Sequence, residues 1–197
     1  MRRSSVCFST LRGFVGLAVL IGAGSCASRP HPHLPTTGIS WGSGDTVGLT
    51  PPFFDRDVEA LCDPPVGWIA EPLKKNSMHT HQVWVSPTHH TAYGVIRFEL
   101  PLPLGEDIAL DGFISHMKST EGSAELLSRT DDPNLPGLRI VAKGAKHTIR
   151  ANFMVFGSIG WAYYAGSNNG SPVDEKEMAV AVRAREHTQV GTPSSAK

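Results

Sequence analysis

Four histidines lie around one predicted β-hairpin, and their imidazoles are the side chains in this sequence best suited to metal binding. His79 and His81 are two residues apart on an extended segment, so their side chains point to the same face. His89 and His90 follow across the predicted turn and would point to opposite faces if extended. Three of the four could hold zinc or copper with one open coordination position. The alternative is that all four are polar residues of a turn and a strand edge, because no Asp or Glu lies within the hairpin.

Motifs of known catalytic chemistry are missing from the sequence. There is no Gly-x-Ser-x-Gly elbow, no phosphate-binding glycine loop and no His-Glu-x-x-His pair. The acidic pair Glu106-Asp107 is explained by a helix start, and Asp131-Asp132 by a loop. We therefore expect a protein that is not an enzyme and needs no cofactor, with zinc or copper as the alternative.

Aromatic residues offer a second kind of candidate site. Trp84, Trp161, Tyr163 and Tyr164 would form a binding surface if they faced outward, since aromatic side chains are enriched at the centres of protein interfaces. The same residues would form core if they faced inward. The sequence leaves both interpretations open.

The N-terminal residues predict export from the cytoplasm. Three arginines precede the apolar run 14–21, and small residues connect this run to Cys26. This order is typical of a signal peptide, which we place at residues 1–25. The apolar run is too short for a bilayer span, which takes about 20 apolar residues.

Residues 23–26, Ala-Gly-Ser-Cys, resemble the lipobox of bacterial lipoproteins, although Ala23 stands where leucine is usual. The resemblance implies that the Cys26 thiol carries a lipid. The protein would then be anchored to a membrane of the bacterial cell envelope and face the periplasm or the exterior. The alternative is ordinary cleavage after Ser25 or Ala27, which would release a secreted protein.

Charge and cysteine content narrow the possible partners. Cleavage after residue 25 removes three arginines from the 197-residue chain and leaves 15 basic against 18 acidic residues, a net charge of about −3. No basic patch stands out, which argues against a nucleic-acid partner.

Only Cys62 remains beyond Cys26, so we expect no internal disulfide and a buried, unreactive Cys62 thiol.

The mature chain divides into three predicted parts. Residues 26–60, rich in Pro and Gly, predict a flexible tether; residues 61–189 predict one globular domain; and residues 190–197 predict a disordered tail. Within the domain, alternation predicts strands around residues 81–86, 92–100, 124–129, 138–142, 149–155 and 161–165.

Two helices complete the predicted domain. They span residues 106–119 and about 172–188, and Ser171 is the expected N-cap of the second. In the strand at 92–100, Arg97 and Glu99 share the predicted solvent face. The pattern predicts an α+β fold, an antiparallel sheet with both helices packed on one face.

Pro65-Val66-Gly67-Trp68 before the first hairpin, together with this element order, resembles the PsbP-like fold, an α/β sandwich. That group includes photosystem II extrinsic subunits, a Ran-binding nuclear protein and DcrB-like bacterial lipoproteins. The resemblance covers residues 61–189 and implies binding or assembly rather than catalysis, without assigning any binding residue. We therefore expect a non-catalytic binding or assembly module for an unknown envelope protein. A metal-binding protein and a purely structural envelope protein are the alternatives.

Overall fold

A computed structural model describes residues 46–131 and 137–190. The predicted signal peptide, Cys26, the tether up to residue 45 and the tail from residue 191 lie outside the described residues. Within the described ranges, no helix has both the length and the apolar character needed to cross a bilayer.

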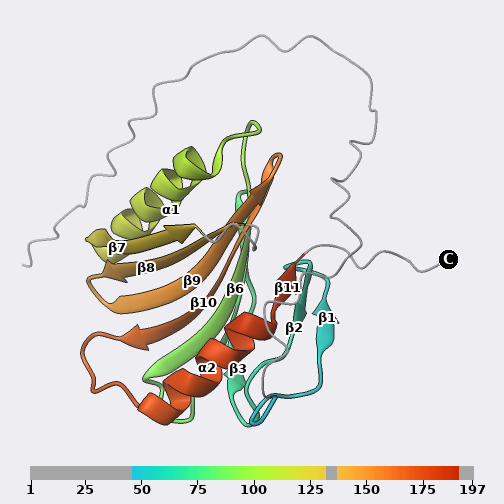
Figure 1. Ribbon diagram of the computed structural model, residues 1–197, viewed down its shortest axis with the longest axis vertical. Coiled ribbons are helices and arrows are strands. Elements are labelled where there is room, and N and C mark those ends of the chain that lie inside the picture. The colour runs from blue at the N-terminus through green and yellow to red at the C-terminus, as the bar shows by residue number, and fades with distance from the viewer. Residues whose placement is uncertain (1–45, 132–136, 191–197) are drawn as a thin grey trace, which may run out of the picture. The chain divides into compact units, whose positions relative to one another are not determined.

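The centre of the domain is an eight-stranded antiparallel sheet (Figure 1). Its strand order is β3-β5-β6-β10-β9-β8-β7, and β4 also pairs with β5. The strands are β3 (Ile69–Ala70), β4 (Lys74–Lys75), β5 (His79–Val85), β6 (Thr91–Glu99), β7 (Ala124–Asp131), β8 (Leu138–Gly144), β9 (His147–Phe156) and β10 (Ile159–Asn168). Alternation explains why they form: in β8, Leu138, Ile140 and Ala142 are buried while Arg139 and Lys143 are exposed.

A second, smaller sheet has the order β1-β2-β11 and consists of β1 (Phe53–Asp55), β2 (Ala60–Cys62) and β11 (Gln189–Val190). The predicted tether is therefore wrong over residues 46–60, since β1 lies there and Val58 and Ala60 are fully buried. Gly48 lies in a turn and Pro51 and Pro52 directly precede β1, so composition alone hid the short strands that follow. Val190, placed in the predicted tail, is the last residue of β11.

Two helices, α1 (Glu106–Glu121) and α2 (Glu175–His187), pack on the large sheet and confirm the α+β fold. They lie on opposite faces, so the prediction that both share one face is wrong. In β10, Trp161 and Tyr163 join the core beneath α2, whereas Ala162 and Tyr164 join the core beneath α1. Successive strand residues point to opposite faces, so each helix covers its own side. Because β10 is apolar on both faces, its sequence could not assign the helices to a side.

The N-cap of α2 is Asp174 and not the expected Ser171. The Asp174 side chain accepts hydrogen bonds from the backbone N–H groups of Lys176 (2.9 Å) and Glu177 (3.1 Å). We predict that Asp174→Ala lowers the free energy of unfolding by about 1 kcal/mol, because two helix N–H groups lose their acceptor. Ser171→Ala is the matched control and should leave urea denaturation unchanged. Equal losses in the two variants would contradict the assignment.

Candidate binding site

A surface pocket of about 250 Å³ lies at the end of the β5–β6 hairpin away from its turn. Three segments line it: the β1–β2 loop, the turn from β4 into β5, and the end of β6. The lining residues are Arg56, Asp57, Glu59, Lys75, Asn76, Ser77, Met78, His79, Thr80, Arg97 and Glu99. We refer to this feature as the Arg97 pocket.

Arg97 is the most constrained charge in the Arg97 pocket. Its Nε lies 3.2 Å from Glu59 Oε2, and its Nη1 donates to Glu99 Oε1 at 2.9 Å. Only 12 % of the Arg97 side chain is exposed. A guanidinium so far removed from water needs carboxylate partners, and here two of them hold it in one position. The strand pattern predicts that Arg97 faces solvent, but the β1–β2 loop brings Glu59 against it.

Glu59 itself has a left-handed backbone conformation, with φ of 51°. For a residue other than glycine this conformation costs roughly 1–3 kcal/mol and persists only where the surroundings impose it. Val58 and Ala60 on either side are fully buried, which fixes the backbone at this point. The strained loop thus positions the Glu59 carboxylate against Arg97.

The rim of the Arg97 pocket is accessible to a partner. Lys75 Nζ lies 3.2 Å from Asp57 Oδ1 in an exposed ion pair, which contributes at most about 1 kcal/mol. Arg56 is exposed and makes no ion pair with any described residue. Met78 is 54 % exposed, and Asn76 Oδ1 accepts a hydrogen bond from its backbone N–H at 2.7 Å. The pocket therefore offers both signs of charge beside an apolar side chain.

His79 and His81 share one face of β5, the face that α1 covers elsewhere in the sheet. The His79 ring contacts His116 of α1 at a centroid distance of 5.3 Å. His81 Nε2 and the Tyr164 hydroxyl share a hydrogen bond of 2.8 Å. Burial lowers the pKa of His81 to about 4, with smaller contributions from the charges of Lys74 and His79. The pKa of His79 is also lowered, mainly by burial and to a smaller extent by the charge of His116.

The other two histidines of the predicted metal site lie elsewhere. His89 and His90 belong to the turn of the hairpin, whereas His79 starts β5 at its opposite end, about 20 Å away at the usual strand rise. No group of three potential metal ligands is found in residues 46–131 and 137–190. The alternative of a zinc or copper site built from three of these histidines is therefore wrong, because a hairpin separates its turn from its open end. His116 was missed, since nothing in the sequence shows which strand faces α1.

The four candidate aromatic residues are core and not surface. Trp84, Trp161, Tyr163 and Tyr164 are each no more than 9 % exposed. Trp161 Nε1 donates a hydrogen bond to the carbonyl oxygen of Val58 at 2.9 Å, which joins the sheet to the β1–β2 loop. Of the two interpretations that the sequence leaves open, burial in the core is correct and an aromatic binding surface is not.

Cys62 is fully buried, as expected. Burial raises the pKa of its thiol to about 12, which suppresses the reactive thiolate.

The arrangement of strands and helices matches a solved structure from a cyanobacterium. The solution structure of cyanobacterial PsbP (CyanoP) from Synechocystis superposes with a TM-score of 0.51 at 13 % sequence identity, over 76 % of this chain and 98 % of that one. The fold is PsbP-like. This result confirms the PsbP-like fold that the Pro65–Trp68 segment and the element order imply.

Other comparisons add little to this PsbP-like domain. A crystal structure from Bacteroides thetaiotaomicron has 11 % identity and a TM-score of 0.37, over 75 % of this chain and 51 % of that one. No family model and no curated protein matches the chain.

Proposed function

We propose that this PsbP-like chain is a non-catalytic binding or assembly module of the bacterial cell envelope. It recognises a protein partner through the Arg97 pocket. The observation that carries this proposal is the Arg97 guanidinium, held by Glu59 and Glu99 beneath an accessible rim that includes Met78.

The chemistry of the pocket suits a protein surface. Arginine and methionine are enriched at protein interfaces, and arginine is frequent among the residues that contribute most to binding. Arg97 is held in place before any partner arrives, so little side-chain entropy is lost on binding. The free charge of Arg56 at the rim supplies attraction for an acidic group on the partner.

The proposed location follows from the N-terminal sequence. Lipid attachment at Cys26 would hold the domain at a membrane, where an envelope partner is present at high effective concentration. The PsbP-like fold supports the proposal in general terms only, since fold alone does not determine function.

Site-specific photo-crosslinking in the cells that produce the protein tests this proposal. A photo-crosslinking residue in place of Met78, at the rim, should give a discrete adduct in the membrane fraction. The same residue in place of Ile108, which is exposed on α1 and does not line the pocket, is the matched control and should not give this adduct. Arg97→Lys and Arg56→Glu should each reduce the Met78 adduct, the former by about tenfold or more. Cys26→Ala should remove the adduct from the membrane fraction.

Two outcomes would overturn the proposal. Either the Met78 and Ile108 positions give the same adducts, or neither Arg56→Glu nor Arg97→Lys weakens the Met78 adduct. Because Arg56 is exposed and makes no ion pair with a described residue, its substitution does not threaten the fold.

A further inference from the structure

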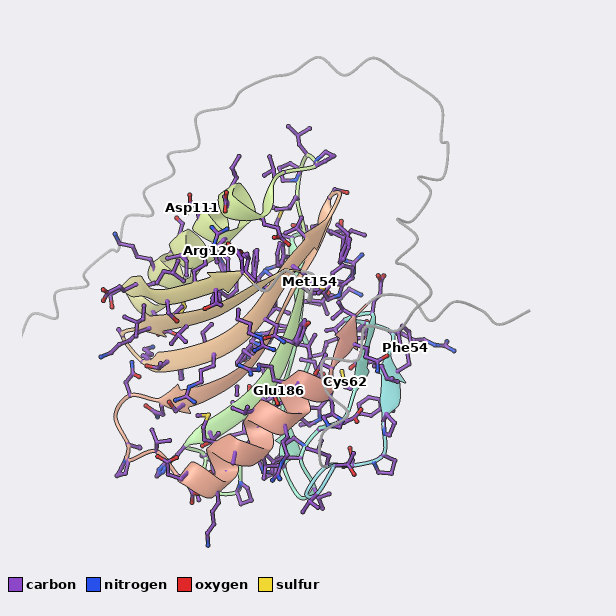
Figure 2. The ribbon with its side chains drawn as sticks, viewed as in Figure 1. Phe54, Cys62, Asp111, Arg129, Met154 and Glu186 are labelled. Atoms are coloured by element: carbon purple, nitrogen blue, oxygen red, sulfur yellow. The ribbon has the colours of Figure 1, made fainter. Side chains whose placement is uncertain are left out.

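On the face of β8 and β9 opposite α1, the described residues leave Arg139 and Arg150 exposed beside α2, whereas Asn152 and Met154 of β9 are buried. Helix α1 packs on the opposite face of β7, β8 and β9, while α2 lies mainly over β10 and β6. Figure 2 labels Met154 on β9 and Glu186 on α2, and side-chain nitrogen atoms are visible between these two labels. We call this surface the β8–β9 face.

Two arginines on the β8–β9 face have no acidic partner among the described residues. Arg139 pairs with Asn152 in the register of β8 and β9, and Arg150 lies two residues from Asn152. Arg139 and Arg150 are therefore diagonal neighbours on one face, about 7–8 Å apart. Both side chains are exposed. Their mutual repulsion would be relieved by an anion placed between them.

Two acidic residues on neighbouring elements face other basic residues. Glu125 lies directly opposite Lys143 in the pairing of β7 with β8. Glu186 Oε1 accepts a hydrogen bond from Arg185 Nη2 at 3.0 Å. The acidic residues therefore leave the positive charge of Arg139 and Arg150 without compensation.

Asn152 lies beneath these arginines with its hydrogen-bonding capacity unused. It is 1 % exposed, and within the described part of the chain neither its Oδ1 nor its Nδ2 has a hydrogen-bond partner. Leaving such a buried group unsatisfied costs about 1–3 kcal/mol, so native proteins rarely do so without a reason. Both atoms are buried, so a ligand on this face reaches Nδ2 only where the side chains above it move aside.

Arg185 of α2 borders the same place. Its side chain is largely buried, and its Nε has no hydrogen-bond partner among the described residues. Burial lowers the pKa of Arg185, the charge and hydrogen bond of Glu186 oppose this effect, and the charge of Arg139 adds to it. Helix α2 itself contacts β9. Three arginines and one amide donor thus surround one region of the β8–β9 face.

We propose that the β8–β9 face binds an oxyanion, the phosphate or carboxylate group of a soluble ligand, between Arg139, Arg150 and Arg185 and above Asn152. The planar guanidinium matches the geometry of both groups and can bind them through two parallel hydrogen bonds. This site is separate from the Arg97 pocket, since it lies on β8 and β9 and shares no residue with it.

Thermal unfolding of the full chain tests the proposed site. Sodium phosphate and sodium malonate are compared with sodium chloride at equal ionic strength and pH 7. A ligand that binds only the folded state raises the melting temperature, and we expect a saturable rise of about 3 °C with at least one oxyanion. The double variant Arg139→Gln with Arg150→Gln should remove this rise. Arg129→Gln is the matched control, because Arg129 lies on the opposite face and pairs with Asp107 and Asp131.

Each outcome has a definite meaning. A rise with phosphate alone assigns phosphorylated ligands, a rise with malonate alone assigns carboxylates, and a rise with both supports a general oxyanion site. No rise with either anion, or an unchanged rise in the double variant, overturns the proposal. A rise that Arg129→Gln also removes would overturn it as well, since the effect would then not belong to this face.

Discussion

Replacing Gly94 by alanine is expected to lower the free energy of unfolding by about 2–3 kcal/mol, although alanine is normally the better strand residue. Gly94 of β6 pairs with Tyr164 of β10, and the Tyr164 ring lies across the space that a side chain would fill. A Cβ atom at residue 94 would lie 2.6 Å from both Cζ and the hydroxyl oxygen of Tyr164. The ring is buried and its hydroxyl shares a hydrogen bond with His81, so moving the ring would cost both packing and this hydrogen bond. Urea denaturation of the two proteins measures the effect.

A double-mutant cycle separates the clash from other effects of the substitution. In a Tyr164→Ala background the ring is absent, so adding Gly94→Ala should cost nothing further, and the coupling energy should be about 2–3 kcal/mol. Gly112→Ala is a second control, because Gly112 is exposed in the interior of α1 and nothing lies near its side-chain position. That substitution should raise stability by up to about 1 kcal/mol. A cost at Gly94 that is the same with and without the Tyr164 ring would contradict the proposed contact.

Local pattern predicted the elements that are apolar on one side only. In β8 the alternation of Ile140 with Arg139 identifies a strand with one buried face, and the spacing of Leu110 and Met117 identifies the buried side of α1. These patterns depend on neighbours a few residues apart. These patterns and the element order were sufficient to predict the PsbP-like fold.

Contacts between residues distant in sequence were not predictable in the same way. Arg97 is adjacent to polar residues in sequence, and only the folded β1–β2 loop brings Glu59 against it. His116 contacts His79 because α1 packs back over the sheet, and the spacing of nearby residues does not predict this contact. The four buried aromatic residues were ambiguous for a related reason, since an apolar run predicts burial or an interface equally well. The candidate site therefore could not be predicted without tertiary contacts, whereas the order of most strands and helices could.

Acidification should destabilise the domain through His81. The pKa of His81 is lowered to about 4 in the folded protein, mainly by burial, whereas the unfolded chain has the ordinary value near 6.5. Between these values the unfolded state binds more protons, so stability is complete above pH 6.5 and is lost as the pH falls toward 4. The difference of about 2.5 pH units corresponds to a loss of up to about 3 kcal/mol. The lowered pKa of His79 acts in the same direction.

Substitution of His81 by glutamine isolates this contribution. Glutamine can still share a hydrogen bond with the Tyr164 hydroxyl but does not titrate, so the stability of His81→Gln relative to wild type should improve by up to about 3 kcal/mol from pH 7 to pH 4. Urea denaturation at both pH values gives this difference, and His89→Gln in the exposed turn is the matched control. A pH-independent difference would show that His81 titrates normally in the folded protein.

Gly94→Ala provides a separate check, because a Tyr164 ring pushed aside would admit water to His81. The free energy of unfolding of Gly94→Ala should therefore fall less between pH 7 and pH 4 than that of wild type.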